Sequence, residues 1–297
     1  MVREGEQEEK MVIRKQSVML PDGTAVPSLG QGTWFLGERR NRRKEELDSL
    51  RAGISAGMTL LDTAEMYGDG KAEELLGEAI QDFDRSSLFL VSKVYPHNAG
   101  RKNIFKSCIK TLERLNTDYL DLYLLHWRGS IPLSETVECM EQLKKEGKIR
   151  RWGVSNFDTA DMKELWSVPG GNNCQINQVL YHVASRGIEY DLIPWLEEHK
   201  VPVMAYCPLA QAGDLKRGLY ENPALIRIAD AHQCTVSNIL LAFAIRSKNV
   251  VAIPRTGNKD HALDNAKAWE VNLTQDELIE INRAFPAPVK KTYLDIV

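Results

Sequence analysis

The sequence lacks the features that mark secreted, membrane-spanning and metal-binding proteins. Its five cysteines are scattered and form no CxxC pair, so neither a zinc site nor a redox motif is indicated. No apolar run approaches the roughly 18 residues of a membrane span, and the first residues, MVREGEQEEKMVIRKQ, lack the apolar core of a signal peptide. We therefore expect reduced thiols, no metal, no membrane partner and a cytoplasmic location.

The sequence also lacks a strong charge of either sign and a dinucleotide fingerprint. A net charge of -3 gives no strong attraction to phosphate backbones, so a small-molecule partner is favoured over nucleic acid. We expect a monomer. The stretch GQGTWF (30–35) begins like GxGxxG but carries Phe35 in the last position, so it is not a Rossmann fingerprint.

What the sequence does contain is a regular alternation of short apolar runs and amphipathic stretches of helical period. Alternation of this kind predicts a parallel sheet, and eight such units over about 280 residues favour a (β/α)8 TIM barrel over a doubly wound sheet. The expected strands are residues 27–33, 59–63, 88–94, 120–126, 151–155, 174–179, 201–207 and 250–254.

The segment before the alternation predicts a hairpin, because VMLPDGTAVP (18–27) has PDGT as a turn between two apolar pairs. Residues 1–10 are mostly charged and polar, which predicts a mobile tail. No shift in composition marks a second domain, so residues 11–297 are expected to form one domain.

The barrel prediction directs the search for chemistry to the carboxyl ends of the strands. Asp62, Lys93 and His126 lie at the ends of three successive expected strands, and Tyr67 follows the first of them. A buried ammonium needs an opposite charge, which Asp62 would supply to Lys93. A held ammonium would in turn lower the pKa of the Tyr67 phenol, making it a better acid toward a developing alkoxide.

Each of these residues also has a plainer interpretation. A lysine at a strand end often reaches solvent, a loop tyrosine often packs, and a lone histidine in an apolar strand is usually a core residue. A desolvated Lys93 would also suit a Schiff-base lyase or aldolase, although an ammonium pinned by Asp62 is a poor nucleophile. The combination of these four residues indicates a function more specifically than any one of them does.

The order and spacing of these four residues resemble those of the aldo-keto reductase superfamily. The resemblance extends from about Leu29 to Pro288. LLDTAEMYGDGKAEELLGEAI (60–80) resembles its first signature, VSKVY (91–95) its lysine strand, and YLDLYLLHW (119–127) its histidine strand. The remaining matches are to its cofactor-binding strands, in GKIRRWGVSNF (147–157), NQV (177–179), MAYCPLA (204–210) and AIPRTGN (252–258). Within the family, the sequence is similar to bacterial reductases of methylglyoxal and other small aldehydes.

The resemblance implies a barrel closed at its base by the hairpin and an NADPH-dependent reduction of aldehydes or ketones. It implies that Tyr67 is the proton donor, that Lys93 and Asp62 tune it, and that His126 orients the substrate carbonyl. Ser155, Asn156 and Gln178 would hold the nicotinamide carboxamide and Tyr206 would stack on the ring. The other implied cofactor-binding residues are Gly32, Thr33, Trp34, Asp62, Pro208, Leu209, Arg255, Thr256, Asp264 and Asn265.

Three departures from the family pattern concern cofactor binding. Cys207 stands where many members have a serine that supports the pyrophosphate, and His261 stands where many have an arginine near the adenosine phosphate. Arg255 replaces the commoner lysine and keeps its charge.

Residues beside the motifs are expected to line the substrate pocket. Aromatic walls with few charges suit small, weakly polar aldehydes, and the modest loops predict a shallow, open pocket of broad specificity. A rival interpretation is a cofactor-sensing binding module, which an intact catalytic set disfavours. The expected lining residues are Trp34, Met66, Tyr95, His126 and Trp127.

Overall fold

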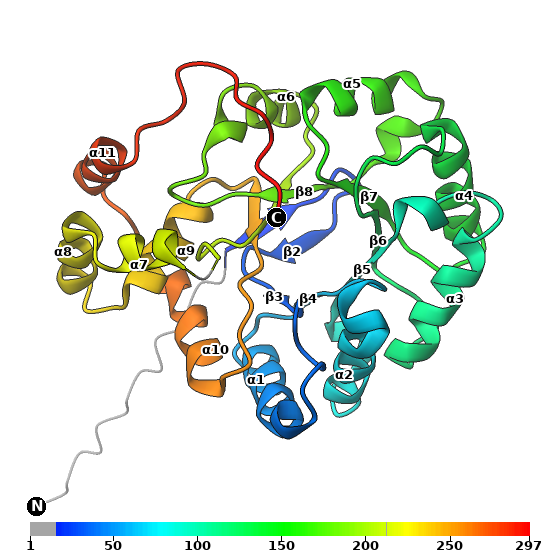
Figure 1. The fold of residues 1–297 in the computed structure, drawn as a ribbon, viewed down its shortest axis with the longest axis horizontal. Helices are drawn as coiled ribbons and strands as arrows, with labels where there is room; N and C mark the ends of the chain where they lie inside the picture. The colour runs from blue at the N-terminus through cyan, green and yellow to red at the C-terminus, as the bar shows by residue number, and fades with distance from the viewer. Residues whose placement is uncertain (1–15, 212) are drawn as a thin grey trace, which may run out of the picture.

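The computed structural model describes residues 16–211 and 213–297 and contains an eight-stranded parallel barrel (Figure 1). The expected tail, residues 1–10, lies outside the described residues. Hydrogen bonds from Gly30 N to Ala252 O (2.9 Å) and from Ala252 N to Ser28 O (2.8 Å) join the first strand to the last, so the sheet closes on itself. The barrel strands, in spatial order, are β3 (Gln31–Gly32), β4 (Leu60–Asp62), β5 (Phe89–Val94), β6 (Leu122–Leu125), β7 (Trp152–Ser155), β8 (Asn177–Leu180), β9 (Val203–Tyr206) and β10 (Val250–Ala252).

The expected hairpin is present and plugs one end of the barrel. β1 (Ser17–Met19) pairs antiparallel with β2 (Ala25–Pro27), with Val18 opposite Val26. Both valines are buried and belong to one apolar cluster with barrel-interior side chains such as Leu122 and Ile176. Burying these side chains explains why the hairpin docks at the base of the barrel.

Helices form the outer ring, as the periodicity predicts (Figure 1). Their apolar faces pack on the outward-facing strand residues in the largest core cluster. The helices are α1 (Arg43–Ser55), α2 (Lys71–Ile80), α3 (Ile104–Leu115), α4 (Leu133–Lys145), α5 (Thr159–Ser167), α6 (Leu192–Glu198), α7 (Asp214–Tyr220), α8 (Pro223–Ala231), α9 (Val236–Ala244), α10 (Lys259–Ala266) and α11 (Gln275–Ala284). In the described residues, no helix is both long and apolar enough to cross a membrane.

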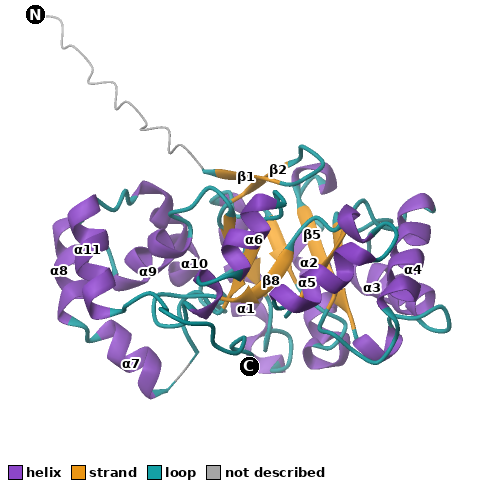
Figure 2. Cartoon of the chain, turned by 90° about the horizontal axis from the view of Figure 1, so that it is seen from above, coloured by secondary structure: helices purple, strands orange, loops and turns teal. Residues whose placement is uncertain are grey.

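The last segment of the chain crosses the end of the barrel opposite the hairpin. Residues 286–297, called the C-terminal strap below, follow α11 and end over the centre of the barrel (Figure 1). In the perpendicular view the hairpin and the C-terminus lie at opposite ends (Figure 2). The strap therefore borders the mouth formed by the carboxyl ends of the strands.

The barrel interior gives a test of the packing. Ile176 is 0% exposed inside the barrel, whereas Ile226 on α8 is 38% exposed. We expect Ile176→Ala to lower the free energy of unfolding by about 2 to 5 kcal/mol, because it removes buried methylenes and leaves a cavity. Ile226→Ala is the control, with an expected loss below about 1 kcal/mol. Urea denaturation of both variants measures the difference, and equal losses would contradict the assigned packing.

Candidate active site

The centre of the mouth is the ammonium of Lys93, which is 0% exposed. Its Nζ donates hydrogen bonds to Asp62 Oδ2 (2.8 Å), to the carbonyl oxygen of Thr63 (2.8 Å) and to the hydroxyl oxygen of Tyr67 (3.0 Å). These contacts engage the three protons of an ammonium group. The structure therefore brings together Asp62, Tyr67 and Lys93, as the sequence predicts.

Asp62 is held on both of its carboxylate oxygens. Oδ2 accepts from Lys93, and Oδ1 accepts a hydrogen bond from Gln178 Nε2 at 2.8 Å. The backbone carbonyl of Asp62 also accepts from Thr33 Oγ1 at 3.0 Å. Burial raises the pKa of the Asp62 carboxyl and lowers that of the Lys93 ammonium, while their ion pair opposes both shifts. The pair is thus a dry, fully hydrogen-bonded unit.

The pKa of Tyr67 corrects one expectation. Burial raises the pKa of this phenol well above its ordinary value, and the charge of Asp62 adds to the increase. The sequence prediction of a lowered Tyr67 pKa is therefore wrong for the structure, because burial sets the direction of the shift. Tyr67 remains protonated, and since its oxygen accepts from Lys93, its own proton is left to be donated elsewhere.

An unbroken series of rings extends from Tyr67 across the mouth. Tyr67 lies 6.3 Å from Trp34 and 5.8 Å from His126 between ring centroids. His126 lies 4.8 Å from Trp127, which meets Tyr95 edge-on at 5.9 Å. Met66 and Trp34 pack with Tyr67 in a small apolar cluster that is separate from the main core. The five expected pocket residues are thus contiguous, although their contact with a substrate stays a prediction.

His126 is neutral in this surrounding. Burial and the nearby charge of Lys93 lower its pKa from 6.5 to about 2. Its Nδ1 atom is buried and has no hydrogen-bond partner among the described residues. A neutral imidazole can donate one hydrogen bond to a carbonyl oxygen without adding a charge to the site.

The four residues expected to contact the nicotinamide lie next to this centre. They are Ser155 on β7, Asn156 directly after it, Gln178 on β8 and Tyr206 on β9. Asn156 has a positive φ of 58° and donates from Nδ2 to the carbonyl of His126 (3.2 Å) and to Ser155 Oγ (3.3 Å). The hydroxyl of Tyr206 donates to Asn156 Oδ1 at 2.9 Å. Gln178 is already bonded to Asp62 through its amide nitrogen, so only its amide oxygen remains without a hydrogen bond in the described residues.

A second group of expected cofactor residues lies at the end of β9 and β10. Arg255 is exposed, with its guanidinium 5.8 Å from the centre of the Phe35 ring, and forms no ion pair with a carboxylate in the described chain. Cys207, Pro208 and Leu209 follow β9, where Cys207 has a positive φ of 50°. A Cβ at Gly32 would lie 3.1 Å from the carbonyl oxygen of Ile253, a close approach that favours glycine at this position.

Two of the remaining expected residues, Asp264 and Thr256, have structural partners. Asp264 Oδ2 accepts from Thr235 Oγ1 at 2.8 Å, which ties α10 to the beginning of α9. Thr256 Oγ1 accepts from Asn258 N at 3.1 Å in the turn before α10, and Asn265 is buried on that helix. His261 is exposed in its first turn. Their assignment to the cofactor stays a prediction.

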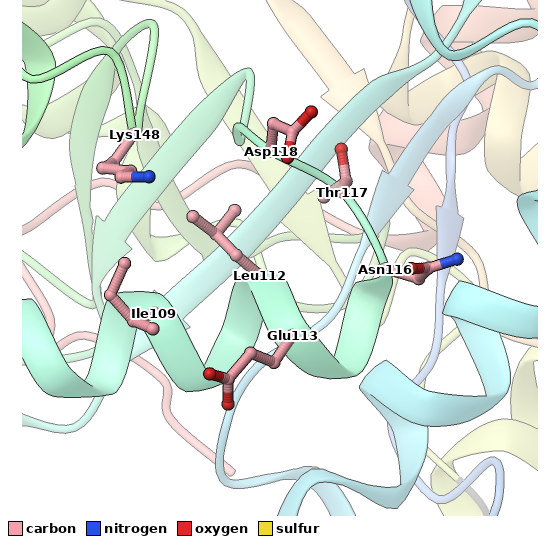
Figure 3. Close-up of a pocket in the computed structure, with 7 residues that line it drawn as sticks. All are labelled: Ile109, Leu112, Glu113, Asn116, Thr117, Asp118 and Lys148. Atoms are coloured by element: carbon pink, nitrogen blue, oxygen red, sulfur yellow. The ribbon is translucent and has the colours of Figure 1, made fainter.

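A surface hollow elsewhere does not belong to this site. It is lined by residues such as Glu113, Asn116 and Lys148, between the end of α3 and the start of β7 (Figure 3). These residues precede β6 and β7, so the hollow lies at the amino ends of the strands. The candidate chemistry lies at the opposite end.

Two parts of the site could not be assigned from the sequence. The Thr63 carbonyl is a backbone acceptor, which residue type does not reveal. The second part is the C-terminal strap, because the backbone of Val297 lies close enough to the Tyr206 hydroxyl to oppose the increase in its pKa. Only the tertiary path of the chain shows this contact.

The mouth of this parallel barrel brings together the tyrosine, lysine, aspartate and histidine by which the sequence resembles the aldo-keto reductases, and comparison with known proteins agrees. Residues 28–285 match the model of the Aldo/keto reductase family, and the chain belongs to that family.

Named relatives are similar over nearly the whole chain. Methylglyoxal reductase YeaE of Escherichia coli K12 is 53% identical, covering 96% of this chain and 100% of its own. The glyoxal reductase of Bacillus subtilis 168 is 33% identical, covering 90% and 92%. A solved aldo/keto reductase from Klebsiella pneumoniae in complex with NADP and acetate has a TM-score of 0.93 at 53% identity, covering 95% of this chain and 100% of its own.

The neutral histidines predict how stability depends on pH. Burial lowers the pKa of His126 from 6.5 to about 2 and that of His182 from 6.5 to about 4. Below pH 6.5 the unfolded chain binds these protons and the folded protein does not, so stability falls as the pH drops. Each ring contributes a slope of up to about 1.4 kcal/mol per pH unit.

We therefore expect His126→Asn to reduce the slope of the free energy of unfolding against pH between about pH 6 and pH 4. In this range His126 takes up no proton in the folded protein. Urea unfolding at several pH values measures the slope. Ile226→Ala, which removes no titratable group, should retain the wild-type slope. An unchanged slope in His126→Asn would show that this ring titrates normally in the folded protein.

Proposed function

We propose that the protein is an NADPH-dependent reductase of small aldehydes, methylglyoxal among them, with Tyr67 as the proton donor. The observation that carries this proposal is the buried contact of 3.0 Å between Lys93 Nζ and the Tyr67 hydroxyl, beside a neutral His126. The named relatives, which include methylglyoxal and glyoxal reductases, support the substrate class.

The residues present fit NADPH. Arg255 has no carboxylate partner in the described residues, and a planar guanidinium suits the 2′-phosphate of the adenosine half. The amide oxygen of Gln178 and the polar groups of Ser155 and Asn156 lie where a carboxamide could be held, beside the Tyr206 ring. Solved relatives from Klebsiella pneumoniae contain NADP or NADPH.

The cofactor, when bound, supplies the hydride. Tyr67 and His126 then act on the substrate oxygen, the first as acid and the second as a neutral hydrogen-bond donor. As negative charge develops on that oxygen, the phenol releases its proton. Lys93 already donates to the phenol oxygen and stabilises the phenolate that remains. Asp62 keeps the ammonium charged and in place.

Tyr67→Phe tests the proton donor. The variant keeps the ring and its packing but removes the acid, so kcat should fall by about 10²- to 10⁴-fold. Binding of NADPH, measured by quenching of protein fluorescence, should change little. Turnover is followed as NADPH oxidation with a panel of aldehydes that includes methylglyoxal. Retained turnover would remove Tyr67 from the mechanism.

The same assays separate the rival functions. A lyase or aldolase would form a Schiff base on Lys93, and borohydride would trap the substrate there. A binding module would bind NADPH and reduce none of the aldehydes. Lys93 engages all three protons in hydrogen bonds, so a Schiff base would require breaking its ion pair with Asp62. We expect no trapped adduct.

Arg255→Ala tests the cofactor preference. Removing the guanidinium should raise the KM for NADPH by about 10-fold or more, because a charge-assisted pair with phosphate is lost. The KM for NADH, which lacks the 2′-phosphate, should change little. Arg39→Ala, before α1, is a control that removes a positive charge from another loop. Equal effects on both cofactors would contradict the assignment of Arg255.

A further inference from the structure

The loop after β3 carries an aromatic side chain, Phe35, that neither core packing nor the proposed reaction explains. Phe35 follows Trp34 directly, and half of it (50%) is exposed. Its backbone has a positive φ of 64°, which bulky residues rarely adopt because their Cβ crowds the backbone. Partial burial offsets little of this cost. A strained, half-exposed ring at the edge of a candidate cofactor site indicates a functional role.

The residues that follow Phe35 hold its backbone in this conformation. Leu36 N donates to the carbonyl oxygen of Thr33 at 2.9 Å, which closes a turn, and the Leu36 side chain is buried. Gly37 N donates to Glu46 Oε2 on α1 at 2.9 Å. The turn is therefore anchored to the core and to a helix of the outer ring. It presents the Phe35 ring at a defined place on the mouth.

The Phe35 ring has two neighbours that belong to different parts of the candidate site. It stacks on Trp34, with 4.5 Å between ring centroids and 19° between the planes. The guanidinium carbon of Arg255 lies 5.8 Å from its centre. The loops after β3 and β10 are adjacent, since Gly32 N donates to the carbonyl oxygen of Pro254 at 3.1 Å. Phe35 thus joins an expected pocket residue to the residue assigned to the 2′-phosphate.

Arg255 has little else to fix its guanidinium. It is exposed, and within residues 16–211 and 213–297 it forms no ion pair with a carboxylate. A long side chain that is free in solution loses rotamer freedom when it binds a ligand, and this loss weakens binding. The face of an aromatic ring attracts a guanidinium without occupying its N–H groups. The Phe35 ring therefore restricts Arg255 and leaves its donors available to a phosphate.

We propose that Phe35 is a positioning residue that holds the Arg255 guanidinium where the 2′-phosphate of NADPH binds, and thereby increases the preference for NADPH over NADH. This inference rests on the NADPH-dependent function proposed above and extends it to a residue with no polar group. Phe35 acts through Arg255, because a phenyl ring has no hydrogen-bond donor for a phosphate. NADH lacks the 2′-phosphate, so its binding should not depend on the ring.

Phe35→Leu tests the inference, because leucine keeps an apolar side chain on the same backbone but has no ring. The readout is the ratio of the Kd for NADH to the Kd for NADPH, measured by titration calorimetry on the full chain without any aldehyde. Phe35→Leu should weaken NADPH binding about two- to five-fold, as expected for a cation–π contact at an exposed site. NADH binding should not change. Phe35→Trp, which restores a ring, should keep or increase the wild-type ratio.

Two further variants make the result specific to the contact between the ring and the guanidinium. In an Arg255→Ala background, Phe35→Leu should have no further effect on NADPH binding, because the group that the ring holds is absent. Tyr119→Leu is the matched control. The ring of Tyr119, which precedes β6 at the amino ends of the strands, lies 4.0 Å from the guanidinium carbon of Arg85 and 4.5 Å from that of Arg150. Removing it should leave the ratio unchanged.

An unchanged ratio in Phe35→Leu would overturn the inference, as would an equal loss for both cofactors or an undiminished loss in the Arg255→Ala background. If Phe35→Leu does not fold, Phe35→Asn decides in its place, because asparagine adopts a positive φ more readily and also lacks the ring. Absence of turnover with every aldehyde in the wild type would instead contradict the proposed function. Because the ratio is measured without turnover, the two failures are distinguishable.

Discussion

The site depends on one constraint, which is that the ammonium of Lys93 lies in a dry barrel interior. An isolated charge there would cost many kcal/mol, and removing one partner of a buried pair typically costs about 3 to 5 kcal/mol. Asp62, the Thr63 carbonyl and the Tyr67 hydroxyl satisfy its three protons, and Gln178 satisfies the far oxygen of Asp62. Solvation of one cation thereby fixes the relative positions of the groups that the proposed chemistry uses.

The register of the strands brings these hydrogen-bond partners to Lys93 without distorting the strand backbone. Asp62 of β4 pairs with Val91 of β5, and Val91 points into the barrel with the interior cluster. Side chains alternate along a strand, so Lys93 points inward as well, one layer nearer the mouth. Gln178 is reached from the far side of the barrel, a separation of 116 residues in the sequence. A parallel barrel is the arrangement that brings these distant positions to one point.

The sequence predicts most of this architecture because its signals are local. Apolar runs and helical periods locate the strands and helices, and Asp62, Lys93 and His126 are conspicuous because charged or polar residues interrupt apolar strands. The contact of Gln178 with Asp62 and the path of the strap to Tyr206 are not predictable in this way, because they depend on how distant segments meet. The direction of the Tyr67 pKa was wrong because the sequence shows the ammonium but not the degree of burial.

The raised pKa of Tyr67 bears on the order of events in the proposed reaction. A tyrosine with a lowered pKa would rest partly as phenolate and would have to regain a proton before acting as an acid. Burial keeps the Tyr67 proton in place, and it also keeps His126 neutral. In the proposed reaction, the Tyr67 phenol would release its proton only as negative charge develops on the substrate oxygen, so proton release would be coupled to hydride transfer. Burial, which opposes ionisation of both Tyr67 and His126, would thereby confine ionisation to the reacting complex.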